Sequence, residues 1–192
     1  MARRVKGRGA GFWLAVALLM VAVQAAVLHA MGQPAVCACG HVRLWQGDVI
    51  GPENSQQITD WYTPSHVIHG FLLYALAQLV LRRRPLAARL ALAVAIEVAW
   101  ELIENSPPVI ARYRQQALAQ GYVGDSILNS VVDTVAMAAG FLLARLVPVG
   151  ATVGLAIAME VAVAWAIRDN LTLNVVQFIH PIEAVSRWQT GP

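Results

Sequence analysis

Five long apolar segments limit what this chain can fold into. They lie at about residues 11–31, 64–81, 86–104, 127–147 and 149–167. Each is close to the roughly 20 apolar residues that an α-helix needs to cross the hydrocarbon core of a bilayer. The composition agrees, because 58% of the 192 residues are hydrophobic and 13% are charged, with a mean hydropathy of +0.57. The sequence therefore predicts an all-α fold, a polytopic membrane helix bundle of about five transmembrane helices, with residues 1–192 forming a single domain.

Basic residues predict the orientation of these helices. Short loops rich in Lys and Arg remain in the cytoplasm. Such residues precede the first segment, lie between the second and the third or just inside the third, and end the fourth: Arg3, Arg4, Lys6, Arg8, Arg82, Arg83, Arg84, Arg89 and Arg145. We therefore expect a multi-pass protein of the cell inner membrane, with the N-terminus in the cytoplasm and the C-terminus in the periplasm. The first segment is longer than the apolar part of a typical signal peptide and is expected to be an uncleaved anchor.

The charge balance bears on partners. The net charge is +3, and with this orientation every Asp and Glu lies within a span or on the periplasmic side. The positive charge is then a basic cytoplasmic rim, which suits anionic lipid headgroups. We expect membrane lipid as a partner and no nucleic acid.

Three polar segments are expected on the periplasmic side. The first, 32–64, contains Gly, Pro and polar turns, and is predicted to be mostly irregular with one short helix. The second, 106–125, begins with a Pro pair and has a helical pattern through about Gln120, ended by Gly121. The tail after Arg168 is too short and too polar to cross, so we expect it to fold back along the membrane surface.

Acidic residues occur at helical spacing at the end of the third apolar segment. In "AIEVAWELIEN", residues 95–105, Glu97, Glu101 and Glu104 are four and three residues apart and share one stripe of a helix. His66 and His69 open the second segment, three residues apart on one face. The fourth segment begins at the same side of the membrane with Asp125, Asn129 and Asp133.

Polar groups at this depth predict a shared cavity, because an ionised side chain at the bilayer centre costs about 2.5–3.5 kcal/mol unless it has a partner or water. Carboxylates and histidines can act as general acid and base, so the candidate catalytic residues are His66, His69, Glu97, Glu101, Asp125 and Asp133. Candidate substrate-binding residues, which would hold an anion or a polar group, are Arg112, Arg114, Asn129 and Arg168. Glu101 is the acid expected to be most functional, within reach of His66 or His69 and of Asn129 or Asp133.

Metal binding is the alternative use of the same residues. His66, His69, Glu101 and Asp133 are candidate ligands of a divalent metal ion, or a path for protons, and their spacing does not specify the metal. A separate candidate is the "CACGH" cluster of Cys37, Cys39 and His41. Because a disulfide across a single residue is expected to be strained, the interpretations of this pair are soft-metal binding, a disulfide to another chain, or reduced thiols at the interface.

Three stretches carry a resemblance to a known family. "ENSQQITDWYTPSHVIHGFLLY", "EVAWELIENSPPVIARYRQQALAQGYVGDSILNSVVD" and "AIRDNLTLN" resemble a bacterial inner-membrane family known as a domain of unknown function. A more distant resemblance is to VanZ-like membrane proteins, carried by Asp60, His66, Glu97 or Glu101, and Asp125 with Asn129 in that order. The first resemblance implies localisation in the inner membrane, and the second implies a role in the cell envelope.

Three functions fit these observations. The first is an enzyme that acts on a lipid-linked or phosphate-bearing envelope substrate at the periplasmic face. The second is a metal-ion or proton site, and the third is a scaffold whose polar residues hold helices together. The first two require the acids to converge on one water-accessible pocket, whereas in a scaffold they can pair off separately. The sequence identifies neither a substrate nor a cofactor.

Overall fold

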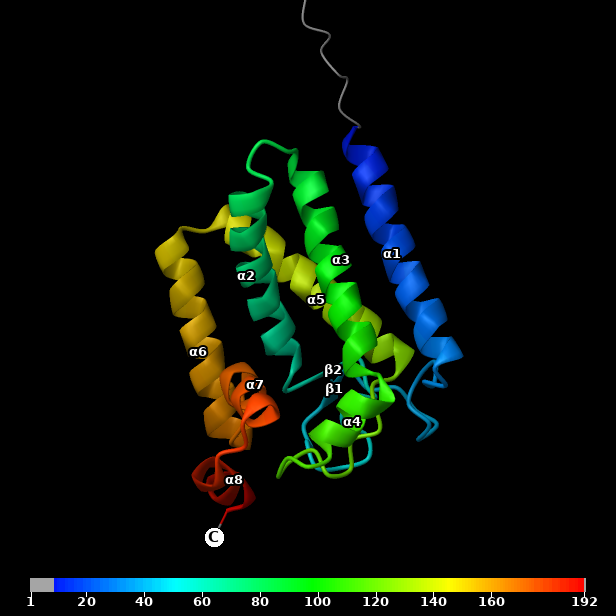
Figure 1. Cartoon of the computed structure of the whole chain (residues 1–192), viewed down its shortest axis with the longest axis vertical. Helices are drawn as coiled ribbons and strands as arrows, with labels where there is room; N and C mark the ends of the chain where they lie inside the picture. Colours follow the sequence, from blue (N-terminus) through cyan, green and yellow to red (C-terminus); the bar gives the residue numbers. More distant parts are fainter. Residues whose placement is uncertain (1–8, 192) are drawn as a thin grey trace, which may run out of the picture.

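The computed structural model describes residues 9–191 and is all-α apart from one very short sheet (Figure 1). Its helices are α1 (Ala10–Ala30), α2 (Thr63–Val80), α3 (Leu86–Glu104), α4 (Pro107–Tyr113), α5 (Ile127–Leu146), α6 (Val149–Ile167), α7 (Leu171–Ile179) and α8 (Glu183–Thr190). The strands β1 (Trp45–Gln46) and β2 (Thr59–Asp60) lie in the segment between α1 and α2. The basic residues Arg3, Arg4, Lys6 and Arg8 lie outside the described residues.

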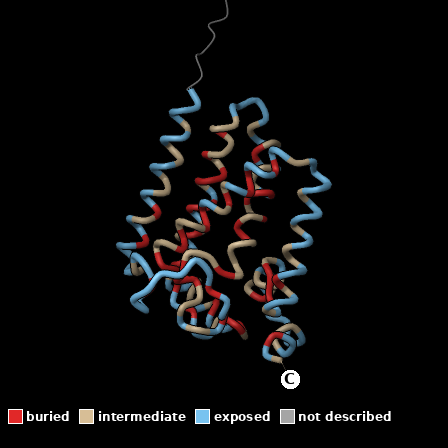
Figure 2. Tube along the Cα trace, turned by 180° about the vertical axis from the view of Figure 1, so that it is seen from behind, coloured by how far each residue is buried: buried red, intermediate tan, exposed pale blue. Residues whose placement is uncertain are grey.

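Three of the helices are long and apolar enough to cross a membrane, namely α1, α5 and α6. In α1 and α6 most residues are exposed (Figure 2), including Leu18 at 72% and Trp165 at 88% exposure. Large apolar side chains with such exposure are typical of a surface that faces lipid or another protein. Helices α2 and α3 have similar lengths, 18 and 19 residues, but carry the histidines and the acidic stripe.

The long helices place the connections at two ends of the bundle. Figure 1 shows the start of α1, the α2–α3 turn and the α5–α6 turn at one end, and β1, β2, α4, α7 and α8 at the other. The arginines of the α2–α3 turn, Arg82–Arg84, and Arg145 near the end of α5 therefore share one end. The loop-rich end carries the start of α2, the end of α3 and the start of α5, which hold the candidate site.

Helices α2 and α5 pack backbone to backbone through two glycines. A Cβ atom at Gly70 would lie 2.1 Å from the carbonyl oxygen of Met137, and one at Gly140 would lie 2.2 Å from that of Val67. Both distances are far below van der Waals contact, so only glycine fits at either position. Small residues allow this kind of close approach between membrane helices. The contact fixes the relative position of the helices that carry His66 and Asp133.

The apolar core lies between α2, α3 and α5. Its buried residues are Ala77, Ala93, Val94, Val98, Met137 and Phe141. Tyr74 meets Phe141 edge to face, with ring centroids 5.2 Å apart. The polar cluster occupies the same three helices nearer to the loop-rich end.

The segments at the loop-rich end differ in part from expectation. In 32–62 the described residues form no helix, and Trp45 pairs with Thr59, and Gln46 with Asp60, as a short parallel bridge. Helix α4 ends at Tyr113 rather than near Gln120. Tertiary contact accounts for the early end, because the buried Tyr113 ring packs on Tyr122, 5.6 Å between centroids, and this brings the chain back towards α4.

The tail after Arg168 forms α7 and α8. Glu160 of α6 accepts hydrogen bonds from the backbone N–H groups of Leu171 and Thr172, both at 3.0 Å. An acid at this position satisfies unpaired donors at the start of a helix and complements the helix dipole. Glu160 therefore has a packing role, and it fixes the start of α7 against α6.

Candidate functional site

His66 is the centre of the buried polar cluster. Its Nδ1 lies 2.7 Å from Glu97 Oε1 and 3.4 Å from Glu101 Oε1, and its Nε2 lies 3.8 Å from Asp133 Oδ2. The three acids are 1–4% exposed. Asp133 also accepts a hydrogen bond from Thr63 Oγ1 at 3.3 Å. One imidazole thus joins acids from α3 and α5, which the sequence predicted to lie at one depth.

The second histidine meets the same carboxylate. His69 Nδ1 lies 3.2 Å from both oxygens of Glu97. One donor atom from each of His66, His69 and Glu97 lies within 4.8 Å of the others. The spacing of three residues on α2 places both imidazoles on one face, and Glu97 faces them from α3. Two histidines and a carboxylate in this arrangement can serve as metal ligands.

Glu101 has partners that differ from those expected. It lies close to His66, as the sequence predicted, but its Oε2 accepts a 2.6 Å hydrogen bond from Ser130 Oγ and not from Asn129. Ser130 in turn accepts from Gln24 Nε2 of α1 at 2.7 Å, and Thr134 donates to Gln24 Oε1 at 2.9 Å. Glu101 Oε1 is buried and has no hydrogen bond within the described part of the chain.

A second group of acids lies beside the first. Asp125 accepts hydrogen bonds from Asn105 Nδ2 at 2.6 Å and from Tyr122 OH at 2.9 Å. Burial raises the pKa of Asp125 to about 6, although the bonds from Asn105 and Tyr122 oppose that shift. One oxygen each from Glu101, Glu104 and Asp125 lies within 4.8 Å of the others. Glu104 is only partly exposed, and it lines the cavity beside the cluster.

These groups border a cavity of about 190 Å³. Its lining comes from the loop before α2, from α2, α3, α4, α5 and α7, and from the segment before α5: Asn54, Ser55, Tyr62, Ser65, His66, His69, Trp100, Glu104, Tyr113, Ala119, Tyr122, Asp125, Asp133, Leu171, Asn174 and Val175. Four of the six predicted catalytic residues line it. The other two, Glu97 and Glu101, lie behind His66 and contact its ring.

The predicted anion-binding residues lie elsewhere. Arg112 Nε donates to the carbonyl of Phe178, Arg114 Nε to that of Tyr122, and Arg168 to that of Trp188. Asn129 donates to the carbonyl of Gln57 at 2.9 Å. Within residues 9–191, none of these four side chains lines the cavity. The hydrogen bonds of these four side chains to backbone carbonyls hold the loops and the tail in place.

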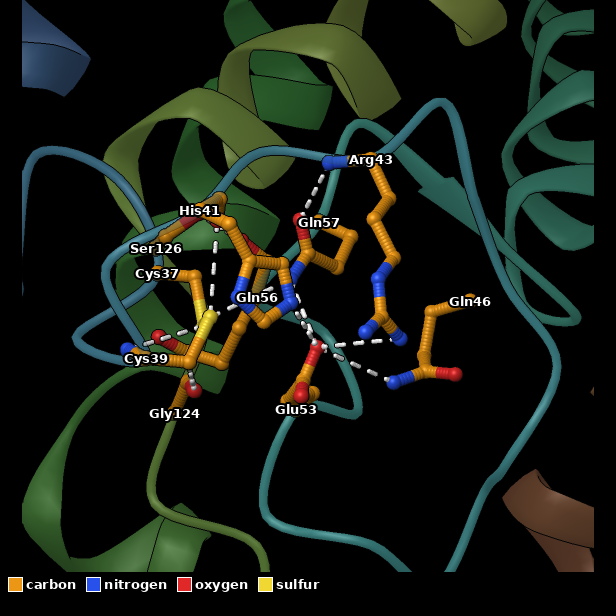
Figure 3. Close-up of a disulfide and its surroundings, with 10 residues drawn as sticks. All are labelled: Cys37, Cys39, His41, Arg43, Gln46, Glu53, Gln56, Gln57, Gly124 and Ser126. Carbon is orange, nitrogen blue, oxygen red and sulfur yellow. Dashed lines mark hydrogen bonds and ion pairs between the residues drawn. A yellow bond between two sulfur atoms is a disulfide. The ribbon is translucent and has the colours of Figure 1, made fainter.

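The cysteines form a disulfide with each other (Figure 3). The expectation that Cys37 and Cys39 would not pair is therefore wrong. A tight turn brings them together, in which the Gly40 N–H donates to the Cys37 carbonyl at 3.3 Å and Gly40 has a φ of +84°, which favours glycine. His41 does not join them as a ligand, because its Nε2 lies 3.1 Å from Glu53 Oε2.

Sequence reasoning did not single out several residues around the site. Gln24 is completely buried in α1 and holds Ser130 and Thr134. The sequence could have indicated this residue, since it is the one amide in the first apolar segment. The sequence did not indicate that Tyr113 and Tyr122 line the cavity, because their position depends on how the loops fold over the bundle.

The fold and site together define a mainly helical protein that has three helices apolar enough to cross a membrane and a buried acid–histidine cluster beside a cavity. The chain belongs to the family described as "Protein of unknown function (DUF2585)", whose match covers residues 28–191.

Relatives at high identity span nearly the whole chain. A UPF0314 protein of Rhizobium johnstonii is 54% identical over 184 residues, covering 96% of this chain and 94% of the relative. A UPF0314 protein of Rhizobium meliloti is 52% identical over 186 residues, covering 97% and 94%. One from Sphingopyxis alaskensis is 51% identical over 179 residues, covering 93% and 95%. No solved structure matches the chain, and these matches do not show the VanZ-like resemblance.

Proposed function

We propose that the protein binds a divalent metal ion in the membrane, with His66, His69 and Glu97 as its ligands. The observation that carries the proposal is the convergence of their donor atoms, from α2 and α3, within 4.8 Å of one another. Zinc lies about 2.0–2.1 Å from a histidine nitrogen, so ligand atoms of a tetrahedral site are about 3.3 Å apart. Small side-chain rotations would bring this group to that spacing.

The charge of the cluster supports a cation. Glu97, Glu101 and Asp133 lie around His66, and the cluster has one further histidine, His69, against Glu97. The described residues that border the cavity include no Lys or Arg. Buried carboxylates need a compensating positive charge or a proton. Glu101 Oε1, which has no hydrogen bond among the described residues, lies 3.4 Å from His66 Nδ1 and is available to a bound ion.

A second candidate function is catalysis on an amphipathic, lipid-linked substrate. It is supported by the cavity, which joins aromatic and apolar side chains, such as Trp100 and Leu171, to the acids and His66. A divalent ion at this site would polarise a phosphate or carbonyl oxygen or activate water. The carboxylates would accept or return protons at the cavity wall. Arg112, Arg114 and Arg168 do not line the cavity and bond to backbone carbonyls, so they give no support to the expected anion clamp.

A scaffold is less well supported. In that case the acids would pair off separately, but Glu97, Glu101 and Asp133 all approach one imidazole, and Glu101 also lies near Glu104 and Asp125. Helix packing alone rarely requires so many acids in one place.

The proposal includes five membrane-spanning helices, with α2 and α3 added to α1, α5 and α6. Their lengths of 18 and 19 residues suit a span, and they run alongside the apolar helices (Figure 1). Arg82–Arg84 and Arg145 share the end opposite the site, which supports a cytoplasmic N-terminus and a site at the periplasmic face of the inner membrane.

Metal analysis tests the proposed site. Protein purified in mild detergent is expected to contain about one divalent ion per chain, and Glu97→Gln is expected to lower that content at least about tenfold, since loss of a ligand weakens a metal site at least as much as loss of a supporting residue. The measurement is elemental analysis by plasma mass spectrometry. Removal of the ion with a chelator is expected to lower the thermal transition of the wild type, because a ligand of the folded state stabilises it.

Glu183→Gln is the matched control. Glu183 lies on α8, where it pairs with Arg187 on the surface, so its loss should leave the metal content unchanged. The proposal fails if wild type and Glu97→Gln carry the same metal content after refolding or reloading with zinc or manganese.

Fusions to reporter enzymes test the proposed topology. A fusion after Arg84 is expected to be active with a reporter that works in the cytoplasm and inactive with one that works in the periplasm, and a fusion after Gln115 is expected to give the reverse. The physical reason is the retention of basic loops in the cytoplasm. Periplasmic activity after Arg84 would overturn the orientation.

A further inference from the structure

The disulfide between Cys37 and Cys39 lies outside the proposed metal site and has surroundings of its own (Figure 3). It follows α1 directly in the sequence. Beside it is a groove lined by Gly32, Gln33, Pro34, Cys37, Ala38, Cys39, Pro52, Glu53, Gln56 and Val123. The chain contains only these two cysteines.

Stabilisation of the fold does not explain this disulfide. A cross-link stabilises a fold mainly by restricting the unfolded chain, and the effect is smallest for short loops. Here the two cysteines are only two residues apart. The bond joins no separate segments and holds no helix to another, so its contribution to stability is close to the minimum for any disulfide.

The two cysteine residues differ in exposure. Cys37 is 4% exposed, whereas Cys39 is an exposed residue beside the groove. The backbone N–H of Cys39 points to Cys37 Sγ at 3.2 Å. A donor in that position stabilises a thiolate on Cys37. Cys39 is therefore the cysteine that an incoming thiolate can reach, and Cys37 is the better leaving group.

A buried glutamine holds the other sulfur. Gln57 Nε2 donates to Cys39 Sγ at 3.3 Å and to Glu53 Oε2 at 2.8 Å. Gln57 is completely buried. Its side-chain Oε1 accepts a hydrogen bond from the backbone N–H of Arg43 at 2.7 Å, and its backbone carbonyl accepts one from the side chain of Asn129. The amide is therefore fixed in place, and it can stabilise a thiolate on Cys39 when that forms.

We propose that Cys37 and Cys39 are a redox-active pair that exchanges with a dithiol reductant. A thiolate of the dithiol attacks Cys39 Sγ, the Cys37–Cys39 bond breaks, and its electron pair leaves on Cys37 as a thiolate, giving a mixed disulfide at Cys39. The second thiol of the reductant, after losing its proton, attacks its own sulfur in that mixed disulfide, and Cys39 leaves as a thiolate. The reductant is oxidised to its disulfide, and the pair gains two electrons and, on protonation, two protons.

Thiol trapping of the whole protein in detergent tests this proposal. Millimolar dithiothreitol, without denaturant, is expected to reduce the pair, and alkylation with a maleimide then adds two labels, seen as a mass shift. Since the chain has no other cysteine, every label reports this pair. Return of the disulfide in oxidised glutathione would complete the cycle.

Single variants test the assigned roles of the two sulfurs. With Cys37→Ser, the remaining exposed Cys39 is expected to react with oxidised glutathione at least about tenfold faster than Cys37 does in Cys39→Ser, because reactivity follows access and thiolate character. Each variant is the control for the other, and the Cys37→Ser/Cys39→Ser double variant must take no label. A native pair that resists dithiothreitol, or a Cys37 that reacts as fast as Cys39, would overturn the proposal. Either result leaves the metal site unaffected.

Discussion

Replacing His66 with alanine is expected to abolish metal binding and to lower the thermal stability of the bundle more than any other single loss in the site. Glu97, Glu101 and Asp133 all lie within 3.8 Å of its ring. Without the imidazole these buried carboxylates lose their shared partner. Removing one member of a buried ion pair typically costs about 3–5 kcal/mol. Elemental analysis and thermal unfolding in detergent measure the two effects.

The control for this variant is His180→Ala. His180 is exposed and directly follows α7, so its removal changes the histidine count without touching the cluster. His66→Ala protein that retains the metal and unfolds at the wild-type temperature would show that the imidazole does not organise the acids.

Gly140→Leu is expected to prevent the native packing of α2 on α5. Any Cβ at this position would lie 2.2 Å from the Val67 carbonyl oxygen, and backbone cannot move aside as a flexible side chain does. Overpacking a well-packed core costs typically about 1–3 kcal/mol, and this substitution adds a whole side chain at a helix–helix contact. We expect the amount of folded protein in the membrane to fall severely, as measured by fluorescence-detected size-exclusion chromatography.

Gly154→Leu is the matched control, because a Cβ at Gly154 on α6 meets nothing within 4 Å. It makes the same chemical change in another apolar helix. Equal accumulation of the two variants would contradict the close contact between α2 and α5.

The part of the site that could be predicted from sequence depends on helical periodicity. Glu97 and Glu101 are one helical turn apart and both face the bundle interior, and His66 and His69 share one face of α2, as their spacing indicated. Both histidines meet Glu97, whereas Glu101 was the acid expected within their reach. Periodicity is reliable here because long helices keep their phase over many residues. The apolar character of α1, α5 and α6 was predictable from the length of their apolar runs.

The loops could not be predicted in the same way. Helix α4 was expected to extend to Gln120, but a contact with Tyr122 ends it at Tyr113. Pairing of Cys37 with Cys39 depends on a turn completed by Gly40, which spacing alone does not reveal. These features come from contacts between segments and have no local pattern in the sequence.

The buried amide of Gln24 constrains how the protein can be assembled. Its partner Ser130 lies 106 residues further along the chain, and protein synthesis runs from the N-terminus to the C-terminus. Helix α1 is therefore complete long before α5 exists, and during that interval the side chain of Gln24 cannot make its native hydrogen bonds. Gln24 can make these hydrogen bonds only after the ribosome has delivered α5, so this polar contact between α1 and α5 forms late in biogenesis.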